Sequence, residues 1–247
     1  MTDADDRESL MVSIMNSIAD AFGNHAILKG GMVLRLLDCP RTTNDLDYVF
    51  VPFSSKNEIK DQLIEALGAL PGAEISCSLN SKTLRCLVRQ KHRTVQVEVQ
   101  VELACASQEL STAVVAKAHQ QQGRIIRVMQ LDVALAHKLA AWNERRLVRD
   151  LYDIYFLYQL AGAKPHLATL TNRLCNIQSR LPGAPKRARL SLAELADVLD
   201  GAAADLTPAA IHEQLRDYLV REELIGLEIR LPITMRRVAS LLRSPPS

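Results

Sequence analysis

Aromatic side chains are scarce in this chain, and their scarcity limits how it can bind other molecules. Phe, Trp and Tyr make up 4% of the 247 residues. Proteins that hold single-stranded nucleic acid by stacking present several aromatic rings on one surface. A wide stacking platform of that kind is therefore not expected here.

A strong net charge is also missing. The 30 Lys and Arg residues against 28 Asp and Glu residues give a formal charge of +2. The field of the whole protein would therefore not attract nucleic acid, and such a partner would have to meet a local basic patch. With 48% hydrophobic and 23% charged residues, the composition is typical of a globular protein.

Cysteine and histidine spacings that mark metal or redox sites are absent from the sequence. The cysteines are Cys39, Cys77, Cys86, Cys105 and Cys175. They are odd in number and never form CxxC, and the six histidines form no HxxxH pair. These spacings indicate neither a zinc knuckle nor a disulfide framework, and they predict reduced thiols, as in a cytoplasm.

Long apolar runs are missing as well. The first ten residues, MTDADDRESL, are acidic and polar, unlike a secretory signal peptide. No apolar stretch approaches the roughly 20 residues that cross a bilayer. We therefore expect a cytoplasmic protein.

Hydrophobic periodicity divides the chain into two halves. In the first half, strand patterns cover residues 25–28, 45–51, 74–79, 83–89, 94–103 and 124–129, and helical patterns cover 7–22, 32–37 and 54–67. In the second half, the patterns are helical only, over 131–143, 150–160, 165–178, 191–199, 208–221 and 233–242. Residues 181–187, LPGAPKR, form the clearest loop. The order predicts an α+β fold in which an α/β half precedes a helical half.

Two aspartates at the start of a predicted strand are the first candidates for chemistry. Asp45 and Asp47 are two residues apart, so both point to one face of the strand, separated by about 6.5 Å. Carboxylates this close repel unless a cation or solvent intervenes, and Mg²⁺ takes one or two carboxylates together with waters and phosphates. Glu98, on the polar face of another strand, is the best candidate for a third ligand of a two-metal site, and Glu102 is the second choice.

A pair of glycines precedes the aspartates by one predicted helix. Lys29, Gly30 and Gly31 follow a short apolar run and lead into the helical pattern of 32–37. Glycines let the backbone approach a phosphate closely, and the amides at a helix start can bind it. The spacing is not GxxxxGK[ST], so a P-loop ATPase is not indicated.

Each of these signals has a plainer explanation when it is taken alone. An Asp-x-Asp sequence is usually a solvated turn, a glycine pair is usually a helix entry, and Glu98 could simply be a polar residue on a half-exposed strand. The order of strand, glycine pair, helix, aspartate strand and acidic strand is far more specific. The combination therefore predicts a phosphate-handling metal site.

A second cluster surrounds Lys138 and Asp153. In one unbroken helix these residues would lie about 22 Å apart, too far to serve one site. We predict a break near 146–149, with Asp150 as the N-cap of a new helix, which would bring Lys138 and Asp153 together. A lysine suits triphosphate oxygens, whereas an aspartate in a first turn is also explained by helix stability.

These segments together resemble the AbiEii/AbiGii-like nucleotidyltransferase toxins, a MenT-like group within the DNA polymerase β-type nucleotidyltransferase superfamily. The matching residues are Lys29-Gly30-Gly31, Arg41-Thr42 leading into Asp45-Leu46-Asp47, Lys138-Leu139 with Arg145, and Arg149-Asp150-Leu151-Tyr152-Asp153. The resemblance covers residues 25 to 160. One departure is Gly30-Gly31, where the superfamily often has Gly-Ser and so a hydroxyl that can contact phosphate.

The resemblance implies a nucleotidyltransferase core over residues 1–129, with a mixed, mostly antiparallel sheet flanked by helices. It implies a C-terminal helical bundle over 130–247 that contributes to the active-site cleft. It further implies a nucleoside triphosphate (NTP) as substrate, Mg²⁺ as cofactor and a nucleotide acceptor, which is the 3′ end of tRNA in characterised relatives. Such transfer blocks translation in a toxin–antitoxin or phage-defence system, so a cognate antitoxin is a possible partner.

Positions in the family pattern give the expected site residues. The resemblance makes Asp45 and Asp47 metal ligands and makes Lys138 and Asp153 catalytic, and the strand pattern adds Glu98 to both sets. The residues expected to hold the nucleotide are Lys29, Gly30, Gly31, Lys138 and Arg145.

Two other functions stay open. The acceptor could be a small molecule or a protein, although the basic stretch Lys82, Arg85, Arg89, Lys91, His92 and Arg93 favours a polyanion. Alternatively, the chain could be an inert relative that only binds nucleotide. The loss of catalytic residues that marks an inert relative is not seen, because the sequence has Asp45, Asp47, Glu98 and Lys138.

Overall fold

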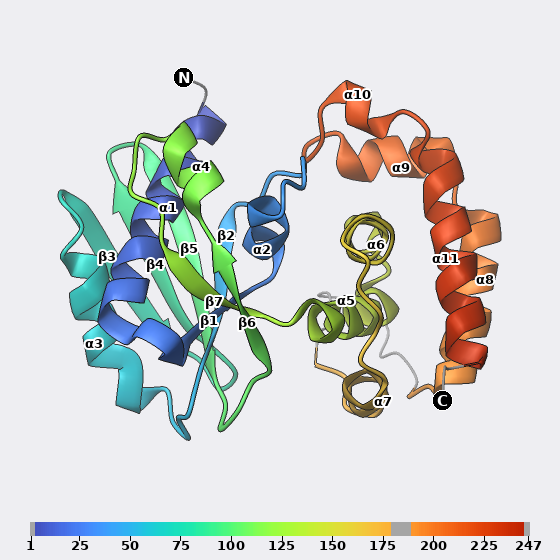
Figure 1. The fold of residues 1–247 in the computed structure, drawn as a ribbon, viewed down its shortest axis with the longest axis horizontal. Coiled ribbons are helices and arrows are strands. Elements are labelled where there is room, and N and C mark those ends of the chain that lie inside the picture. Colours follow the sequence, from blue (N-terminus) through green and yellow to red (C-terminus); the bar gives the residue numbers. More distant parts are fainter. Residues whose placement is uncertain (1–2, 179–188, 245–247) are drawn as a thin grey trace. The chain divides into compact units, whose positions relative to one another are not determined.

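The computed structural model of the protein describes residues 3–178 and 189–244. The chain divides into two compact units, Met1–Gln130 and Leu131–Ser247, which run from blue to green and from green to red in Figure 1. The loop predicted over 181–187 lies outside the described residues.

The first unit is built on a seven-stranded sheet in the order β3-β4-β5-β2-β1-β7-β6. Its strands are β1 (Ala26–Lys29), β2 (Asp45–Phe50), β3 (Ala73–Leu79), β4 (Leu84–Gln90), β5 (Arg93–Val101), β6 (Ser107–Ser111) and β7 (Ile125–Met129). The β1–β7 and β2–β5 pairs are parallel, and the other four pairs are antiparallel. The predicted α+β class with a mixed, mostly antiparallel sheet is therefore confirmed.

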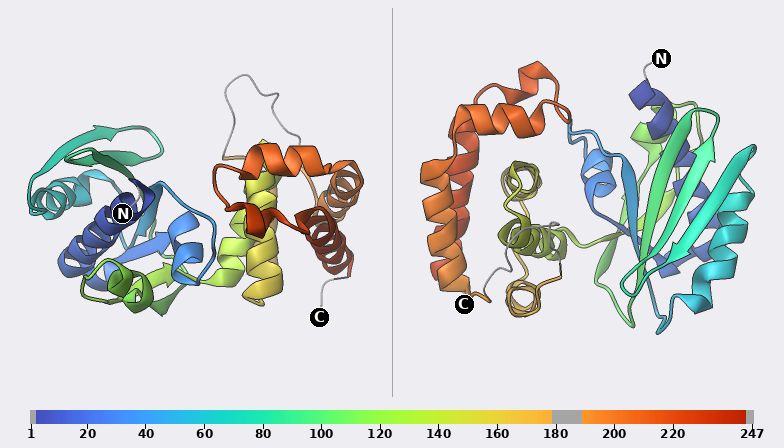
Figure 2. Two further views of the ribbon diagram at one scale, coloured as in Figure 1. Left: turned by 90° about the horizontal axis from the view of Figure 1, so that it is seen from above. Right: turned by 180° about the vertical axis from the view of Figure 1, so that it is seen from behind.

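Helices cover one face of this sheet. The helical elements of the first unit are α1 (Asp3–Phe22), η1 (Gly23–His25), α2 (Gly31–Leu36), α3 (Asn57–Gly68) and α4 (Ala113–Ala118). The residues Val95, Val97 and Val99 of β5 are fully buried on the face that packs against α1. Between them Gln96 and Glu98 point to the opposite face, which no described helix covers over β3, β4 and β5 (Figure 2, right). The alternation predicted for β5 thus separates a core face from a polar open face.

The second unit is helical, as the periodicity predicts. Its elements are α5 (Leu131–Arg145), α6 (Val148–Tyr155), the π-helical turn η2 (Phe156–Leu160), α7 (Leu167–Cys175), α8 (Leu192–Asp205), α9 (Pro208–Leu215), α10 (Arg221–Leu224) and α11 (Leu227–Arg243). Helices α8 and α11 lie side by side (Figure 1), and Leu199 and Val238 are among their fully buried residues. Among the described helices, none is both long and apolar enough to span a membrane.

Several elements differ from the prediction. The helix predicted over 208–221 is divided into α9, which ends at Leu215, and α10, which begins at Arg221. Strand β6 and helix α4 were not predicted, because β6, at the sheet edge, has the largely polar sequence SQELS and α4 has only six residues. Helix α11 begins at Leu227, six residues before the predicted start at Ile233, and Pro232 lies inside the helix. A proline lacks the N–H that an interior position uses and normally ends a helix, so the pattern alone placed the start too late.

The cysteines give a further correction. Cys77 and Cys86 form a disulfide, whereas the sequence predicted reduced thiols throughout. The two residues are direct partners in the antiparallel β3–β4 register, with Cα atoms 4.1 Å apart. Their spacing of nine residues shows this only once the hairpin register is known.

Candidate active site

The glycine turn joins β1 to α2 in a conformation that favours glycine. Gly30, the N-cap of α2, has φ +77° and ψ −150°. Non-glycine residues rarely adopt this conformation because their Cβ clashes with the backbone. A Cβ placed on Gly30 would also lie 2.5 Å from Oδ2 of Asp47. The carboxylate of Asp47 therefore lies directly against the turn, where Gly30 has a hydrogen atom in place of a side chain.

Asp45 and Asp47 lie on the same face of β2, as predicted. Both are half-exposed. Leu46, between them, and Tyr48, after them, point into the core. Burial raises the pKa of the Tyr48 phenol, so this side chain stays neutral beneath the aspartates. The strand thus presents its two carboxylates outward from a rigid apolar support.

The neighbouring strands align further polar side chains with Asp47. In the sheet register Asp47 is opposite Lys29 on β1 and opposite Glu98 on β5. Directly paired residues on adjacent strands have Cβ atoms about 5 Å apart. The ammonium group of Lys29 donates a hydrogen bond to Oε1 of Gln100 at 2.6 Å, so it reaches across β2 to β5. Three strands therefore bring Lys29, Asp47 and Glu98 into one row.

Glu98 is already engaged through one of its two oxygens. Its Oε1 accepts hydrogen bonds from Nε and Nη2 of Arg85 at 3.0 and 2.6 Å and from Gln96 at 3.0 Å. Within the described chain, Oε2 has no hydrogen-bond partner. Glu102, the second choice, lies beyond the end of β5 and is exposed. Of the two, Glu98 is the one aligned with Asp47.

The metal-binding prediction rests on a pair of carboxylates rather than on a formed triad. Among the described residues, no group of three or more His, Cys, Asp or Glu side chains is arranged to hold a metal ion. Asp45 and Asp47 nevertheless offer hard oxygen donors on one face beside a turn that lacks side chains. That donor set fits Mg²⁺, which fills its other positions with waters and phosphate oxygens.

Two residues between the glycines and the aspartates, Arg41 and Thr43, lie at the same candidate site, and no role was predicted for them. A Cβ on Gly31 would lie 2.7 Å from Oγ1 of Thr43 and 2.9 Å from Nη2 of Arg41. Arg41 is 5% exposed, and the Thr43 hydroxyl donates to Oδ1 of Asp45 at 3.2 Å. Thr43 therefore connects the turn to the first aspartate. The Arg41 position is part of the family resemblance, and that was the one signal in the sequence.

In the second unit, the predicted helix break lies where it was expected. Helix α5 ends at Arg145, Arg146 adopts φ +59°, and α6 begins at Val148. Across this break Nζ of Lys138 lies 2.5 Å from Oδ2 of Asp153. The Asp153 side chain is fully buried and the Lys138 side chain is 19% exposed. The break therefore forms a buried ion pair from residues fifteen positions apart.

The role predicted for Asp150 at this break is wrong. The N-cap of α6 is Leu147, and Asp150 lies inside the first turn. Its carboxylate accepts from Nε and Nη2 of Arg145 at 3.1 and 2.5 Å. Asp150 thus closes the break by holding the last residue of α5, and Arg145, predicted to bind nucleotide, is already paired with it.

A further buried ion pair fixes the end of α5. Glu144, 4% exposed, accepts from Nη2 of Arg173 on α7 at 2.9 Å and from the backbone of Gln178 at 3.0 Å. Burial lowers the pKa of Arg173, and the facing Glu144 opposes that shift. Arg173 and the backbone of Gln178 therefore both hold the end of α5 in place.

The comparison with protein families decides the identity of the chain. The family model described as "Nucleotidyl transferase AbiEii toxin, Type IV TA system" matches residues 13–224, from α1 into α10. The chain belongs to this AbiEii toxin family. It is accordingly a nucleotidyltransferase of a toxin–antitoxin type. The matched range includes the glycine turn, the β2 aspartates and the Lys138–Asp153 pair.

Other comparisons are more distant. No curated protein matches the chain. Among solved structures, this AbiEii family member is similar to the CD-NTase CdnG of Bradyrhizobium diazoefficiens, solved in complex with GTP. The similarity covers 97% of this chain and 85% of that chain, with 14% identity and a TM-score of 0.31.

Proposed function

We propose that this AbiEii nucleotidyltransferase transfers nucleotides from an NTP to the 3′ end of tRNA with the help of Mg²⁺. Modified tRNA would then fail in translation, and a cognate antitoxin would restrain the toxin. We propose that this action takes place in the cytoplasm, where NTPs and tRNA are present. The observation that carries the proposal is the contact of Asp47 with the side-chain-free turn at Gly30.

The two β2 aspartates are the proposed metal ligands. Asp45 and Asp47 would hold Mg²⁺, and Oε2 of Glu98 is the oxygen of the third proposed ligand. When bound, such ions neutralise phosphate charge and lower the pKa of a coordinated hydroxyl. Gly30 and Gly31 leave the space beside the carboxylates open, so a triphosphate could approach the backbone.

The transfer step itself is an in-line displacement at phosphorus. The oxygen of the acceptor hydroxyl forms a bond to the α-phosphorus, and the bond from that phosphorus to the bridging oxygen of the β-phosphate breaks. The electron pair of the broken bond leaves with pyrophosphate. The hydroxyl proton passes to a carboxylate, for which Glu98 and Asp153 are the two candidates.

Cationic side chains are proposed to hold the triphosphate. Lys29 lies in the row with Asp47, and the Lys138 side chain is 19% exposed while its ammonium group pairs with Asp153. Both are compact point charges that suit phosphate oxygens. Arg145 is the third candidate, and its bidentate bond to Asp150 would have to be shared or released. We propose that residues of both units are needed for transfer.

Incubation with each α-³²P-labelled NTP and total tRNA tests the proposal. We expect label at the tRNA 3′ end with at least one nucleotide and no label after chelation of divalent cations. Asp47→Ala should abolish transfer. Asp61→Ala is the matched control, because Asp61 is an exposed carboxylate on α3, outside the proposed site. Absence of transfer with every NTP, or full transfer by Asp47→Ala, would contradict the proposal.

Transfer to a small molecule or a protein is the alternative, and binding without turnover is another. Labelling of a total lysate, separated into tRNA, protein and small-molecule fractions, distinguishes the acceptors. Calorimetry with NTP, with and without Mg²⁺, followed by the turnover assay, identifies an inert binder. The exposed Arg85 and Arg89 on the open face of β4 favour a polyanionic acceptor.

A further inference from the structure

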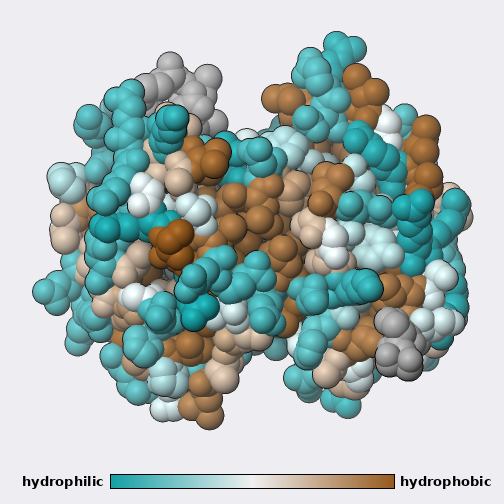
Figure 3. Space-filling view, in the orientation of Figure 1, coloured by the Kyte–Doolittle hydropathy of each residue, from teal (hydrophilic) through white to brown (hydrophobic). Residues whose placement is uncertain are grey.

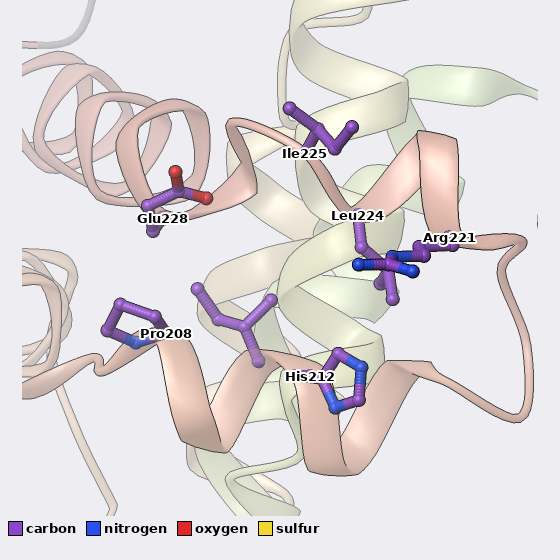
Figure 4. A pocket seen from close by; sticks show the side chains of 7 residues that line it. Pro208, His212, Arg221, Leu224, Ile225 and Glu228 are labelled. Atoms are coloured by element: carbon purple, nitrogen blue, oxygen red, sulfur yellow. The ribbon is translucent and has the colours of Figure 1, made fainter.

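A pocket lies within the second unit where α9, α10 and the start of α11 meet (Figure 4). Its volume is about 400 Å³, and Ile211, Leu224, Ile225 and Pro208 provide apolar lining. In Figure 4 the side chains of His212 and Arg221 lie on one side and Glu228 lies on another. A cavity of this size accepts one or two large side chains of a partner, or a small ligand.

Exposed isoleucines continue from this pocket along α11. Ile225 lines the pocket and is 71% exposed, and Ile229 and Ile233 on α11 are 62% and 40% exposed. Ile229 and Ile233 are one helical turn apart, so they share a face. Figure 3 shows hydrophobic patches among hydrophilic surface over α10 and the adjoining end of α11. Large aliphatic side chains grouped on a surface in this way commonly mark a protein interaction site.

Arginines outnumber glutamates around this apolar surface, by four to three. Arg236 and Arg237 follow Ile233 on the exposed side of α11, Arg230 lies beside Ile229, and Arg221 lines the pocket. Glu228 is the one carboxylate among the residues that line the pocket, and Glu222 and Glu223 of α10 do not line it. Within the described chain, Arg221 and Arg236 form no ion pair. Both guanidinium groups are therefore available to an acidic partner.

We propose that the pocket and the exposed face of α11, defined by Ile225, Ile229, Ile233, Arg221 and Arg236, bind an acidic amphipathic helix of a partner protein. An aliphatic or aromatic side chain of that helix would fill the pocket, and further apolar side chains at helical spacing would cover Ile229 and Ile233. Acidic side chains beside them would face Arg221 and Arg236. This is the helix-in-groove mode of recognition, with a buried anchor and a charged rim.

Other occupants fit the surface less well. A nucleic acid would use the arginines but would leave the isoleucines in contact with a charged backbone. A second copy of the chain would have to present an acidic, apolar helix face to the same surface. The proposal does not depend on nucleotidyl transfer, because none of its residues belongs to the proposed active site.

Three synthetic peptides provide the direct test. One peptide is a stapled 18-residue helix with Leu and one Trp at positions spaced three and four apart and Glu on the flanks. The second has every Glu replaced by Lys, and a third has the composition of the first in scrambled order. We expect the acidic amphipathic peptide to bind the full chain at least tenfold more tightly than either of the others, measured by fluorescence anisotropy. The affinity should fall as salt rises.

Variants locate the binding surface. Ile229→Asp should lower the affinity for the acidic peptide at least tenfold, because it removes apolar contact. Arg236→Glu should lower that affinity at least fivefold, because it removes charge attraction. Both residues are exposed, so thermal melting should show a folded protein. Val114→Asp is the matched control, since Val114 is 73% exposed on α4 of the first unit. It should leave binding unchanged.

Three outcomes would overturn the proposal. The first is an acidic peptide that does not bind, or that binds the Ile229→Asp variant as well as the original chain. The second is competition for the surface by a 20-nucleotide RNA with an affinity above that of the peptide. The third is concentration-dependent self-association in sedimentation velocity that Ile229→Asp abolishes, which would assign the surface to a second copy.

Discussion

The carboxylate of Asp47 lies against the α-carbon of Gly30, so that residue 30 has no room for a methyl group. The contact joins β2 to the turn before α2, two segments that the sequence places seventeen residues apart. The phosphate chemistry that we propose for this position would need both partners: carboxylates that can hold a cation, and a backbone without side chains that a triphosphate can approach.

Replacement of Gly30 by alanine should therefore damage activity more than folding. The new Cβ would meet Oδ2 of Asp47 at 2.5 Å, and φ +77° is strained for alanine. We expect a loss of unfolding free energy of about 1–3 kcal/mol, together with a loss of transfer of at least a hundredfold. Gly68→Ala is the control, because a Cβ there meets nothing within 4 Å. Equal transfer by the two variants would show that the turn has no part in the reaction.

Asp47→Asn tests the charge of the carboxylate without changing its size. The amide is a poor Mg²⁺ ligand compared with a carboxylate, so we expect transfer to disappear and the Mg²⁺ concentration needed for NTP binding to rise. Isothermal titration measures the binding of NTP and Mg²⁺, and chemical denaturation shows whether the variant is folded. Retained Mg²⁺-dependent binding in the variant would exclude Asp47 as a ligand.

Lys138 and Asp153 require a pair of variants, since a buried ion pair is sensitive to the loss of one partner. Lys138→Met leaves the fully buried Asp153 without its cation, and we expect a loss of about 3 kcal/mol in unfolding free energy. The double variant Lys138→Met with Asp153→Asn should recover most of that stability. Transfer should remain absent in both. A double variant that is stable and active would make the pair purely structural.

Arg85 offers a test of Glu98 that does not alter the carboxylate. The pair is a surface ion pair, with side chains 45% and 26% exposed, so Arg85→Ala should change the unfolding free energy by less than about 1 kcal/mol. If Glu98 is a ligand or base, its altered environment should change kcat or its pH profile. Arg89→Ala, on the same face of β4, is the control. An unchanged pH profile in Arg85→Ala would favour Asp153 as the proton acceptor.

The pattern of the sequence was sufficient for features that depend on local geometry. The parity of a strand placed Asp45 and Asp47 on one face, and helix length required a break between Lys138 and Asp153. Features that depend on register or on a loop were missed. Cys77 and Cys86 pair only through the hairpin register, and Asp150 turned from an expected cap into the partner of Arg145.

Arg41 and Thr43 show the same limit at the centre of the site. Their approach to Gly31 depends on how residues 39–44 fold back over the start of α2, and no periodicity describes that path. The proximity of Asp47 and Glu98 likewise depends on the parallel pairing of β2 with β5, two strands that α3 and the β3–β4 hairpin separate in sequence. A strand pattern identifies both faces of such strands but not their neighbours.

The capping box of α8 provides a prediction that depends on pH. Glu194 accepts hydrogen bonds from the backbone N–H and the hydroxyl of Ser191 at 2.7 and 2.8 Å, and these bonds lower the pKa of its carboxyl below the ordinary value of 4.5. A carboxyl with a lower pKa in the folded state contributes stability above its unfolded pKa and loses that contribution as the pH falls through its folded value. Glu194→Gln should therefore lower the melting temperature at pH 7 and have a smaller effect near pH 3. Glu213→Gln, an exposed carboxylate on α9 that forms no hydrogen bond in the described chain, should change neither value. A Glu194→Gln effect as large at pH 3 as at pH 7 would mean that the charge of Glu194 contributes nothing to the cap.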